Sequence, residues 1–196
     1  MCDFGWVSFS SGTPAGTSLL SDIWPGSRAG GPQYITASPT GIAIFSANNG
    51  TNGSEPWVTD GTAAGTKMLA NLDAEGVVTD PSYANYFCDF YGRMLFSAND
   101  GVSGSELWTS DGTSAGTKMV ADLRPGPNGS SPRYLLTLAG KMLFSATDAA
   151  AGNELWISDG TAAGTKLLKD IRPGSSGSSP REFYRYRGRV YFSAND

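Results

Sequence analysis

The sequence predicts an all-β fold, a four-bladed β-propeller with about 49 residues and four antiparallel strands per blade. Three observations lead to it. The chain of 196 residues contains 26 glycines and 11 prolines, and its longest stretch without either, residues 141–151, is no longer than one average helix. The sequence repeats itself with a period of 48 to 51 residues, which is the size of one propeller blade. Within each repeat, apolar and polar residues alternate with period two between turn residues, as they do in half-buried strands.

One motif marks the repeat, Glu-Leu-Trp-x-x-Asp-Gly-Thr-x-x-Gly-Thr. Residues 106–117 and 154–165 match it at every fixed position, and residues 55–66 have Pro in the place of Leu. The first copy, residues 6–17, keeps both Gly-Thr pairs but has Ser8 in the place of Trp. Because four such units fill the chain, we expect a single domain with units of approximately residues 1–46, 47–97, 98–145 and 146–196.

The last complete unit shows how we expect one blade to be built. Its four strands should cover about residues 134–139, 141–146, 154–159 and 165–171. An Asp-Gly pair follows the third strand, and because glycine adopts positive φ without steric cost, this pair predicts a tight hairpin. The pairs in the three complete copies are Asp60 with Gly61, Asp111 with Gly112, and Asp159 with Gly160.

The phase of the repeat predicts how the ring closes. The chain begins inside a third strand and ends after a second strand, so its two ends hold complementary halves of a blade. Pairing of the N-terminal and C-terminal half-blades would close the ring and hide the edge strands that otherwise template aggregation. The alternative is that these boundaries fall inside a longer array of repeats.

Large aromatic residues recur once per blade, and we expect them to fill the core between neighbouring sheets. A buried tryptophan removes on the order of 200 Å² from water, which favours a fixed internal position. The alternative is a stacking platform for sugars. The residues are Trp57, Trp108, Trp156, Phe45, Phe96, Phe144 and Phe192.

Carboxylates recur with the repeat as well. A glutamate lies two residues before each tryptophan and shares its face of the strand, at Glu55, Glu106 and Glu154. If rings of carboxylates converge, the aspartates that follow each Phe-Ser-Ala sequence could help to bind Ca²⁺, namely Asp100, Asp148 and Asp196. No segment has the spacing of a known Ca²⁺ loop, however, and an Asp beside Ser or Thr more often caps a turn. We therefore expect no cofactor and no metal, with Ca²⁺ as the alternative.

The composition argues against catalysis. The chain has no histidine, and no compact cluster pairs a nucleophile with a base, so the machinery of acyl transfer is not visible. Composition does not exclude acid pairs for glycoside hydrolysis. Because the acids recur as repeats, we expect them to be structural and assign no catalytic residue.

The two cysteines, Cys2 and Cys88, do not recur with the repeat. An oxidising compartment would permit a disulfide between them. Two free thiols, or a crosslink to a partner, are equally open alternatives.

Arginine and tyrosine crowd the C-terminal hairpin, and both residue types dominate protein interfaces. Their spacing predicts four arginines on one side of the hairpin and the aromatic rings on the other. A solvated strand face is the simplest interpretation, and a docking surface for an acidic partner or for sugar hydroxyls is the alternative. The candidate partner-binding residues are Arg181, Tyr184, Arg185, Tyr186, Arg187 and Arg189.

The overall charge narrows the classes of partner. The net charge of −4 lacks the positive balance that nucleic acid and anionic lipid require, so we expect neither as a partner. No stretch is long and apolar enough to span a membrane, and residues 1–4 lack the pattern of a secretory signal.

The motif in residues 106–117 and 154–165 resembles the signature of the ELWxxDGT-repeat proteins, a mostly uncharacterised family of secreted and surface proteins. The resemblance extends over essentially the whole chain, although the first unit lacks Glu, Leu and Trp. It implies a β-propeller-like fold, an extracellular or lumenal setting and a role in adhesion or assembly, and it implies no enzyme activity.

We therefore expect a non-enzymatic interaction or scaffold module that displays loops on a rigid ring. Its partners would be proteins of a larger extracellular or lumenal assembly. A lectin-like carbohydrate-binding protein is the alternative, and a hydrolase that uses acidic residues is the second alternative.

Overall fold

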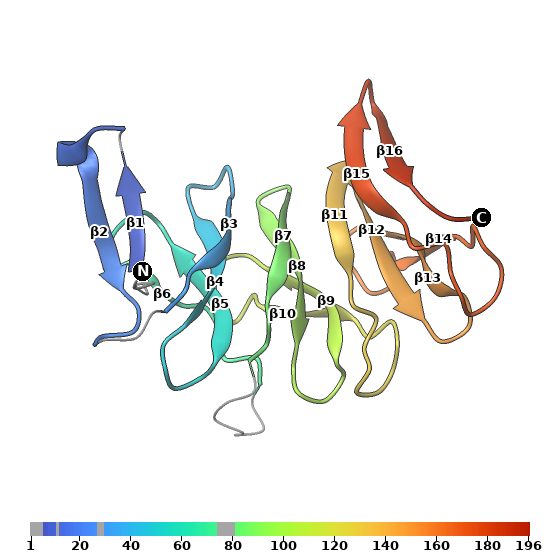
Figure 1. Ribbon diagram of the computed structural model, residues 1–196, viewed down its shortest axis with the longest axis horizontal. Coiled ribbons are helices and arrows are strands. Elements are labelled where there is room, and N and C mark those ends of the chain that lie inside the picture. The colour runs from blue at the N-terminus through green and yellow to red at the C-terminus, as the bar shows by residue number, and fades with distance from the viewer. Residues whose placement is uncertain (1–5, 11, 27–29, 74–80) are drawn as a thin grey trace.

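The computed structural model describes residues 6–10, 12–26, 30–73 and 81–196, and it confirms an all-β, propeller-like architecture of antiparallel sheets. A row of sheets runs through the molecule in the order of the sequence (Figure 1). Two-stranded sheets stand at both ends, and three four-stranded sheets, which we call blades 1 to 3, lie between them. The N-terminal sheet is β1 (Trp6–Ser10) and β2 (Thr17–Asp22), joined through the short 3-10 helix η1 (Pro14–Gly16). Blade 1 is β3 (Gln33–Ala37), β4 (Ala43–Asn48), β5 (Ser54–Thr59) and β6 (Lys67–Met68).

The remaining sheets follow the same plan. Blade 2 is β7 (Asn85–Phe90), β8 (Arg93–Asn99), β9 (Ser105–Ser110) and β10 (Lys118–Ala121). Blade 3 is β11 (Arg133–Leu138), β12 (Lys141–Asp148), β13 (Gly152–Ser158) and β14 (Lys166–Lys169). The C-terminal hairpin is β15 (Arg181–Tyr186) and β16 (Arg189–Ser193). The observed strands of blade 3 therefore agree with the predicted ones to within a few residues.

The first strand of each blade contacts the first strand of the next, so β3, β7, β11 and β15 form the inner row of the molecule. Each of these strands contains a register shift, and the residue there has positive φ, as in Tyr134 at 56°. The corresponding residues elsewhere are Tyr34, Tyr86 and Glu182. A bulge of this kind bends the strand and re-aims its side chains, and this places the tyrosines at the site described below.

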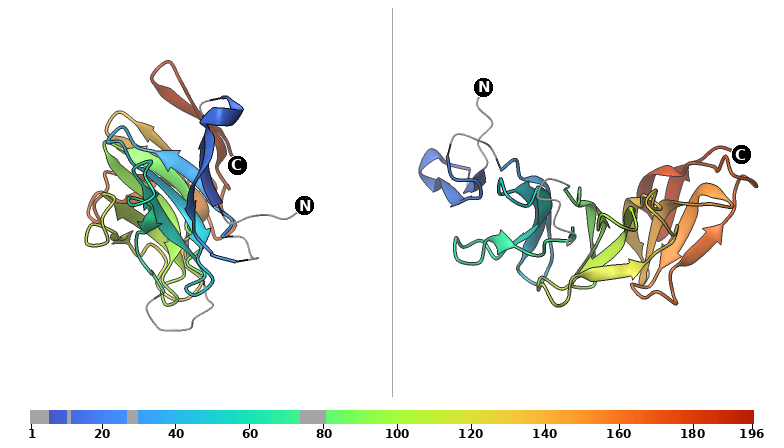
Figure 2. Two further views of the ribbon diagram at one scale, coloured as in Figure 1. Left: turned by 90° about the vertical axis from the view of Figure 1, so that its left-hand side faces the viewer. Right: turned by 90° about the horizontal axis from the view of Figure 1, so that it is seen from below.

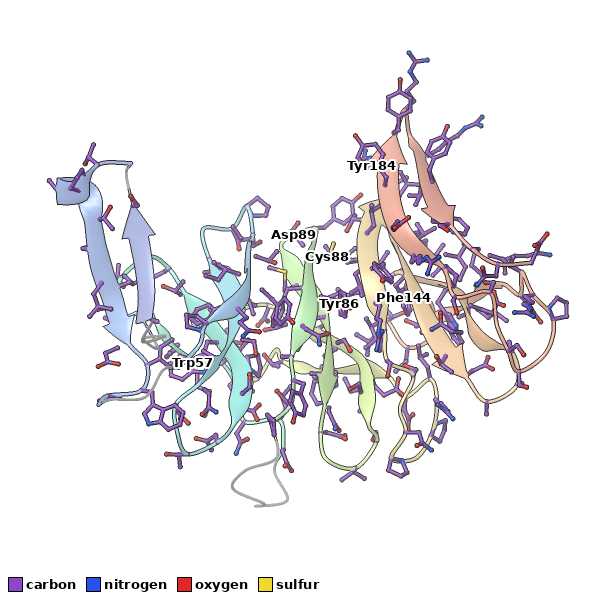
Figure 3. The ribbon with its side chains drawn as sticks, viewed as in Figure 1. Trp57, Tyr86, Cys88, Asp89, Phe144 and Tyr184 are labelled. Atoms are coloured by element: carbon purple, nitrogen blue, oxygen red, sulfur yellow. The ribbon has the colours of Figure 1, made fainter. Side chains whose placement is uncertain are left out.

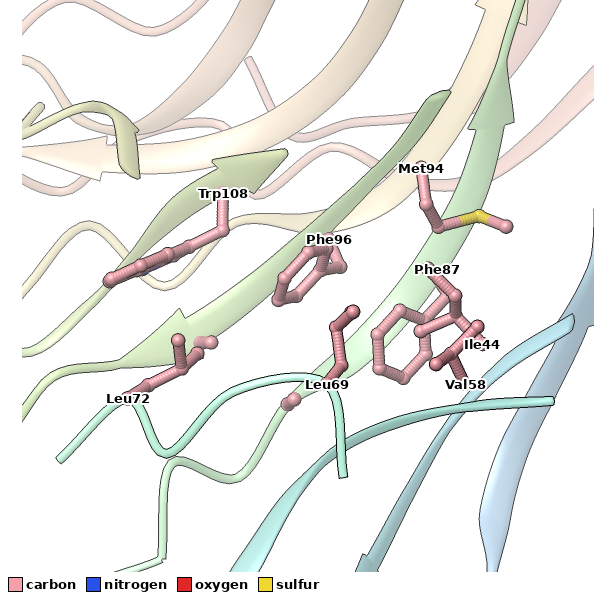
Figure 4. Packing of buried hydrophobic residues seen from close by; sticks show 10 residues of the cluster. Ile44, Val58, Leu69, Leu72, Phe87, Met94, Phe96 and Trp108 are labelled. Atoms are coloured by element: carbon pink, nitrogen blue, oxygen red, sulfur yellow. The ribbon is translucent and has the colours of Figure 1, made fainter. Parts of the chain in front are cut away.

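The core lies between neighbouring sheets. In each blade a phenylalanine of the second strand is paired with the tryptophan of the third, as in Phe96 and Trp108. One face of a blade packs against the phenylalanine and tryptophan rings of the following blade. Ile44 and Val58 of blade 1, for example, lie in one cluster with Met94 and Phe96 of blade 2 (Figure 4). The three paired phenylalanines are fully buried and the three tryptophans nearly so, whereas Phe192, which has no paired tryptophan, is only half-buried. Burial of each such ring stabilises the fold by about 1.5–3 kcal/mol.

The predicted tight hairpin after the third strand is wrong, because the Asp-Gly pair opens a seven-residue loop instead. In blade 2 this loop is residues 111–117, between the end of β9 and the start of β10. The Asp111 carboxylate accepts hydrogen bonds from the N–H and hydroxyl of Thr113, at 2.9 and 2.6 Å. A Cβ on Gly116 would clash with that same carboxylate. Asp, Thr and Gly therefore recur together because they form one capped turn, which is also present after Asp60 and Asp159.

The expected closure of the ring is corrected by the structure. β1–β2 and β15–β16 are separate two-stranded sheets, and they stand at opposite ends of an open row (Figure 1, Figure 2). The strands β1 and β2 do not pair with β15 or β16, so no four-stranded sheet joins the two ends. The two half-blades are complementary in sequence but lie apart.

Burial at the C-terminal end shows the effect of this arrangement. Val120 of β10 is 8 % exposed because blade 3 covers it, whereas Leu168, at the corresponding place in β14, is 44 % exposed. The C-terminal hairpin supplies only the two inner strands of a blade, so nothing among the described residues covers the outer part of blade 3. No helix in the described part of the chain is long and apolar enough to cross a membrane.

Candidate functional site

The recurrent glutamates are buried and do not converge as a ring of carboxylates, which was the possibility that favoured Ca²⁺. Each is fully buried at the start of a third strand. Glu106 accepts hydrogen bonds from the N–H groups of Leu123, Arg124 and Ser130 and from the Ser130 hydroxyl, at distances of 2.5–3.2 Å. Glu154 makes the same four bonds to Ile171, Arg172 and Ser178. The glutamates therefore hold the crossover segments that lead from one blade to the next.

Glu55 binds the crossover that follows its own blade in a similar way. Its carboxylate accepts from the N–H groups of Leu72 and Ser82, at 3.1 and 3.3 Å. Burial raises the pKa of Glu55 to about 7, and these hydrogen bonds and the nearby Asp73 change it less. Burial also raises the pKa of Glu106, against the lowering effect of its four donors.

The carboxylates considered for Ca²⁺ lie in separate loops. Asp100 accepts from the N–H groups of Val102 and Ser103, and Asp148 accepts from those of Ala150 and Ala151. These are turn caps of the kind that Asp favours. In the described ranges, no three Asp, Glu or Cys side chains, with Asp196 included, come together as a metal site.

A pocket recurs three times along the inner row, once between each pair of neighbouring sheets from blade 1 onward. The three cavities have volumes of about 100, 200 and 380 Å³, increasing toward the C-terminus. Corresponding residues of successive repeats line them, and one backbone hydrogen bond recurs at the second and third pockets. The N–H of Ser131 donates to Ser105 at 2.8 Å, and that of Ser179 donates to Asn153 at 2.9 Å. The pockets are therefore one site built three times by the repeat.

The third pocket is the largest of the three and shows how the side chains of two sheets line such a cavity. It lies between blade 3 and the C-terminal hairpin and is lined by Ser131, Arg133, Tyr134, Ser145, Thr147, Asn153, Ser179, Pro180 and Arg181. Arg133 and Ser145 are opposite each other in the β11–β12 ladder and therefore share one face of the sheet. Residues with positive φ at Tyr134, Ser131 and Ser179 turn the backbone around this cavity.

Aromatic rings connect the pockets along the inner row. The ring centroids of Tyr86, which Figure 3 labels, and Tyr134 are 5.9 Å apart. Tyr134 stacks on Phe183 at 6.2 Å, and Phe183 packs on Phe192 at 5.3 Å. Each stacked or tilted ring pair contributes about 0.5–1.5 kcal/mol beyond its buried area, so the row positions the tyrosine rings at the pocket walls.

One wall of the first two pockets contains a polar atom without a partner. Asn85 lines both, and its Oδ1 atom is buried and accepts no hydrogen bond from the described residues. A buried carbonyl oxygen of this kind costs about 1–3 kcal/mol unless water or a ligand donates to it. Asn85 therefore carries a buried acceptor that the described residues leave unsatisfied.

The C-terminal hairpin is exposed as expected, but its two sides are mixed. Tyr184 is 67 % exposed and lies opposite Tyr191. Tyr186 lies opposite Arg189, and residues opposite each other in a ladder are on the same face of the sheet. Arg189 is therefore on the face that carries the tyrosines. Arg187 lies in the turn, where its guanidinium stacks on the Tyr186 ring at 5.2 Å. The prediction of four arginines on one side is wrong because the two-residue turn reverses the chain between Tyr186 and Arg189. Of the six candidate residues on this hairpin, the third pocket contains only Arg181.

Cys88 lies in β7 (Figure 3), and its Sγ atom is 3.7 Å from the Thr137 hydroxyl. It forms no disulfide with a described residue, and burial raises its pKa. Cys2 lies outside the described residues, so the disulfide, the two free thiols and the crosslink stay the three alternatives from the sequence.

Of the residues that line the three pockets, only Arg181 was a candidate from the sequence. A signal was present at the position before each positive-φ residue of the inner strands, where the polar side chain changes from amide to guanidinium along the chain. This position is occupied by Gln33, Asn85, Arg133 and Arg181. Variation at one position of a regular repeat is typical of a residue that faces a ligand rather than the core.

No family model matches the chain, and no curated protein does. Several solved structures resemble it over nearly its whole length. The crystal structure of the computationally designed Ika8 protein is 17 % identical with a TM-score of 0.51, covering 97 % of this chain and 50 % of that one. A puromycin hydrolase S511A mutant complexed with PGG is 14 % identical with a TM-score of 0.57, covering 95 % and 28 %. A structure from a study of two prolyl endopeptidases is 12 % identical with a TM-score of 0.56, covering 99 % and 31 %.

These likenesses bear on the fold alone. The chain spans half or less of the length of each of these proteins, and the identities are low. Because one fold carries many unrelated functions, the activity of the hydrolase and of the endopeptidases says nothing about this chain. What the comparisons show is that these sheets are arranged as in β-propeller proteins.

Proposed function

We propose that the protein is a non-enzymatic interaction module that binds small polar ligands, carbohydrates first among them, in the pockets between its sheets. The observation that carries this proposal is the recurrence of one pocket at three corresponding positions. Each pocket combines a tyrosine ring with short hydroxyl and amide side chains, which is a suitable lining for a sugar. Three weak sites on one chain give strong binding to a ligand that carries several copies of the same group.

The roles of the acidic residues support a binding function over a hydrolytic one. The recurrent glutamates are occupied in holding crossovers, and Asp60, Asp111 and Asp159 are occupied in capping turns. A glycosidase needs two carboxyl groups that face each other across a cavity. None of the residues that line the three pockets is acidic.

The motif supports membership of the ELWxxDGT-repeat family, and we propose that membership together with an extracellular or lumenal location. Each fixed residue of the motif has a structural task in this chain: Glu holds the crossover, Trp fills the core, and Asp, Thr and Gly form the turn. The scaffold role within a larger assembly belongs to the same proposal. The exposed tyrosines and arginines of the C-terminal hairpin favour it as the protein-docking surface.

A glycan array followed by calorimetric titration of the hits tests the proposal. We expect dose-dependent binding with more than one site per chain, and we expect it to weaken at least tenfold in Tyr86→Ala and Tyr134→Ala. Tyr184→Ala is the matched control, since this exposed tyrosine lines none of the three pockets. Absence of any hit would overturn the proposal, and so would turnover of a hit that is lost in a Glu→Gln variant.

A further inference from the structure

The charge of the three pockets changes along the chain. Each pocket lies between two sheets and is lined by one residue from each of them. In both sheets this is the residue that precedes the positive-φ residue of the inner strand. The pair is Gln33 and Asn85 in the first pocket and Asn85 and Arg133 in the second. In the third pocket the pair is Arg133 and Arg181. A protein with a net charge of −4 therefore places two guanidinium groups in the largest of the three cavities.

Both guanidinium groups are available to a ligand. Arg133 and Arg181 are exposed, and within the described part of the chain neither has a carboxylate within 4.0 Å or a hydrogen bond from its side chain. Two like charges beside one cavity repel each other, and an anion between them removes that repulsion. The planar fork of arginine fits the two oxygens of a carboxylate or a sulfate better than a point charge does.

The rest of the third pocket suits a ligand that is rich in hydroxyl groups. Ser131, Ser145 and Ser179 line it with hydroxyls that can both donate and accept. The Asn153 amide donates to the Thr147 hydroxyl at 3.1 Å, and this bond directs the amide nitrogen toward Thr147. An acidic peptide would instead need apolar subsites or a strand edge to pair with. The cavity volume of about 380 Å³ is within the range of small-molecule sites.

The aromatic wall completes the site. Tyr134 is partly exposed, and its ring is held by stacking on Phe183 with an interplanar angle of 25°. A ring fixed in this way loses little side-chain entropy when the C–H groups of a sugar pack against it.

From these observations we propose that the third pocket binds an anionic sugar, a polyhydroxylated ring that carries a carboxylate or a sulfate. Arg133 and Arg181 hold the anionic group, the serine hydroxyls and Asn153 bind the ring hydroxyls, and Tyr134 packs on the ring. This inference rests on the proposed function and goes further, since it makes the three pockets unequal. The first pocket, with Gln33 and Asn85, is the neutral member of the set.

The experiment compares four probes by isothermal titration at physiological salt: glucuronic acid, glucose, inorganic sulfate and a hexapeptide of glutamate. The test variant is R133Q/R181Q, which gives the third pocket the kind of side chain found at Gln33. The control variant is R187Q/R189Q, because these two arginines lie on the same hairpin but do not line the pocket. All four substituted positions are exposed, and thermal melting verifies that both variants fold.

We expect glucuronic acid to bind at least tenfold more tightly than glucose. This preference should vanish in R133Q/R181Q and persist in R187Q/R189Q. Equal binding of glucuronic acid and glucose would overturn the inference and leave the proposed function standing. Sulfate or the acidic hexapeptide binding as tightly as glucuronic acid would also overturn it, since the sugar ring would then contribute nothing. Failure of every probe and of the glycan array would overturn both proposals.

Discussion

Replacement of Glu106 by glutamine should destabilise the fold although it changes one atom of the side chain. The carboxylate accepts two hydrogen bonds on each oxygen, from Leu123 and the Ser130 hydroxyl on one and from Arg124 and the Ser130 amide on the other. A glutamine amide accepts on only one side, and its NH₂ group costs least in the place of the oxygen that faces Leu123 and the Ser130 hydroxyl. The hydroxyl can turn and accept from the NH₂ group, but the Leu123 N–H loses its acceptor. A buried donor left without a partner costs about 1–3 kcal/mol, so we expect a loss of about 1–3 kcal/mol.

Urea denaturation at pH 8, followed by tryptophan fluorescence, measures this loss as a shift of the midpoint at constant m-value. Glu182→Gln is the matched control, because Glu182 is exposed on β15 and its loss of charge should change stability by less than about 0.5 kcal/mol. A Glu106→Gln variant that is as stable as the control would refute the view that the glutamates hold the crossovers.

Three further predictions concern stability. Because the pKa of Glu55 is about 7 in the folded state and 4.5 in the unfolded chain, stability should fall as the pH rises between these values, and Glu55→Gln should flatten this part of a pH series of thermal melts. Gly116→Ala should cost about 1–3 kcal/mol in urea denaturation through its clash with Asp111, and a double-mutant cycle with Asp111→Ala should show positive coupling; additive losses would contradict the turn described here. Val120→Ala should cost more than about 1 kcal/mol, and Leu168→Ala less than half as much, in chemical denaturation; equal losses would mean that the outer part of blade 3 is covered in solution.

Much of the fold could be predicted because the same pattern of apolar, polar and turn residues recurs in each blade. The alternation around Trp108 and Phe96 identified paired strands, and the structure places both rings in the core between the sheets. The motif identified the turn at Asp111 but not its length, since the sequence shows which residues recur and not which hydrogen bonds they make. The carboxylate of Asp111 caps the backbone two residues later, so the loop extends beyond the pair.

The site and the closure were not predictable in the same way. The pockets are made by side chains from two different sheets, and a position such as Arg133 gives no sign in the sequence that Arg181 lies beside the same cavity. Closure depends on the angle between successive sheets, which is set by how the faces of the blades interdigitate rather than by the residues of any one strand. The complementary phase of the two ends was therefore necessary for a ring but not sufficient.

The glutamate contacts also determine where this chain can tolerate change over evolution. Glu106 and Glu154 bind main-chain N–H groups and one serine, and they do not recognise the other side chains of the crossovers. Accordingly, residues 124–129 and 172–177 differ at two places yet form the same turn, with the Gly129 N–H donating to Gly126 at 3.2 Å and the Gly177 N–H donating to Gly174 at 3.3 Å. Foreign peptides grafted between the glycines of such a segment should be displayed without loss of the parent architecture.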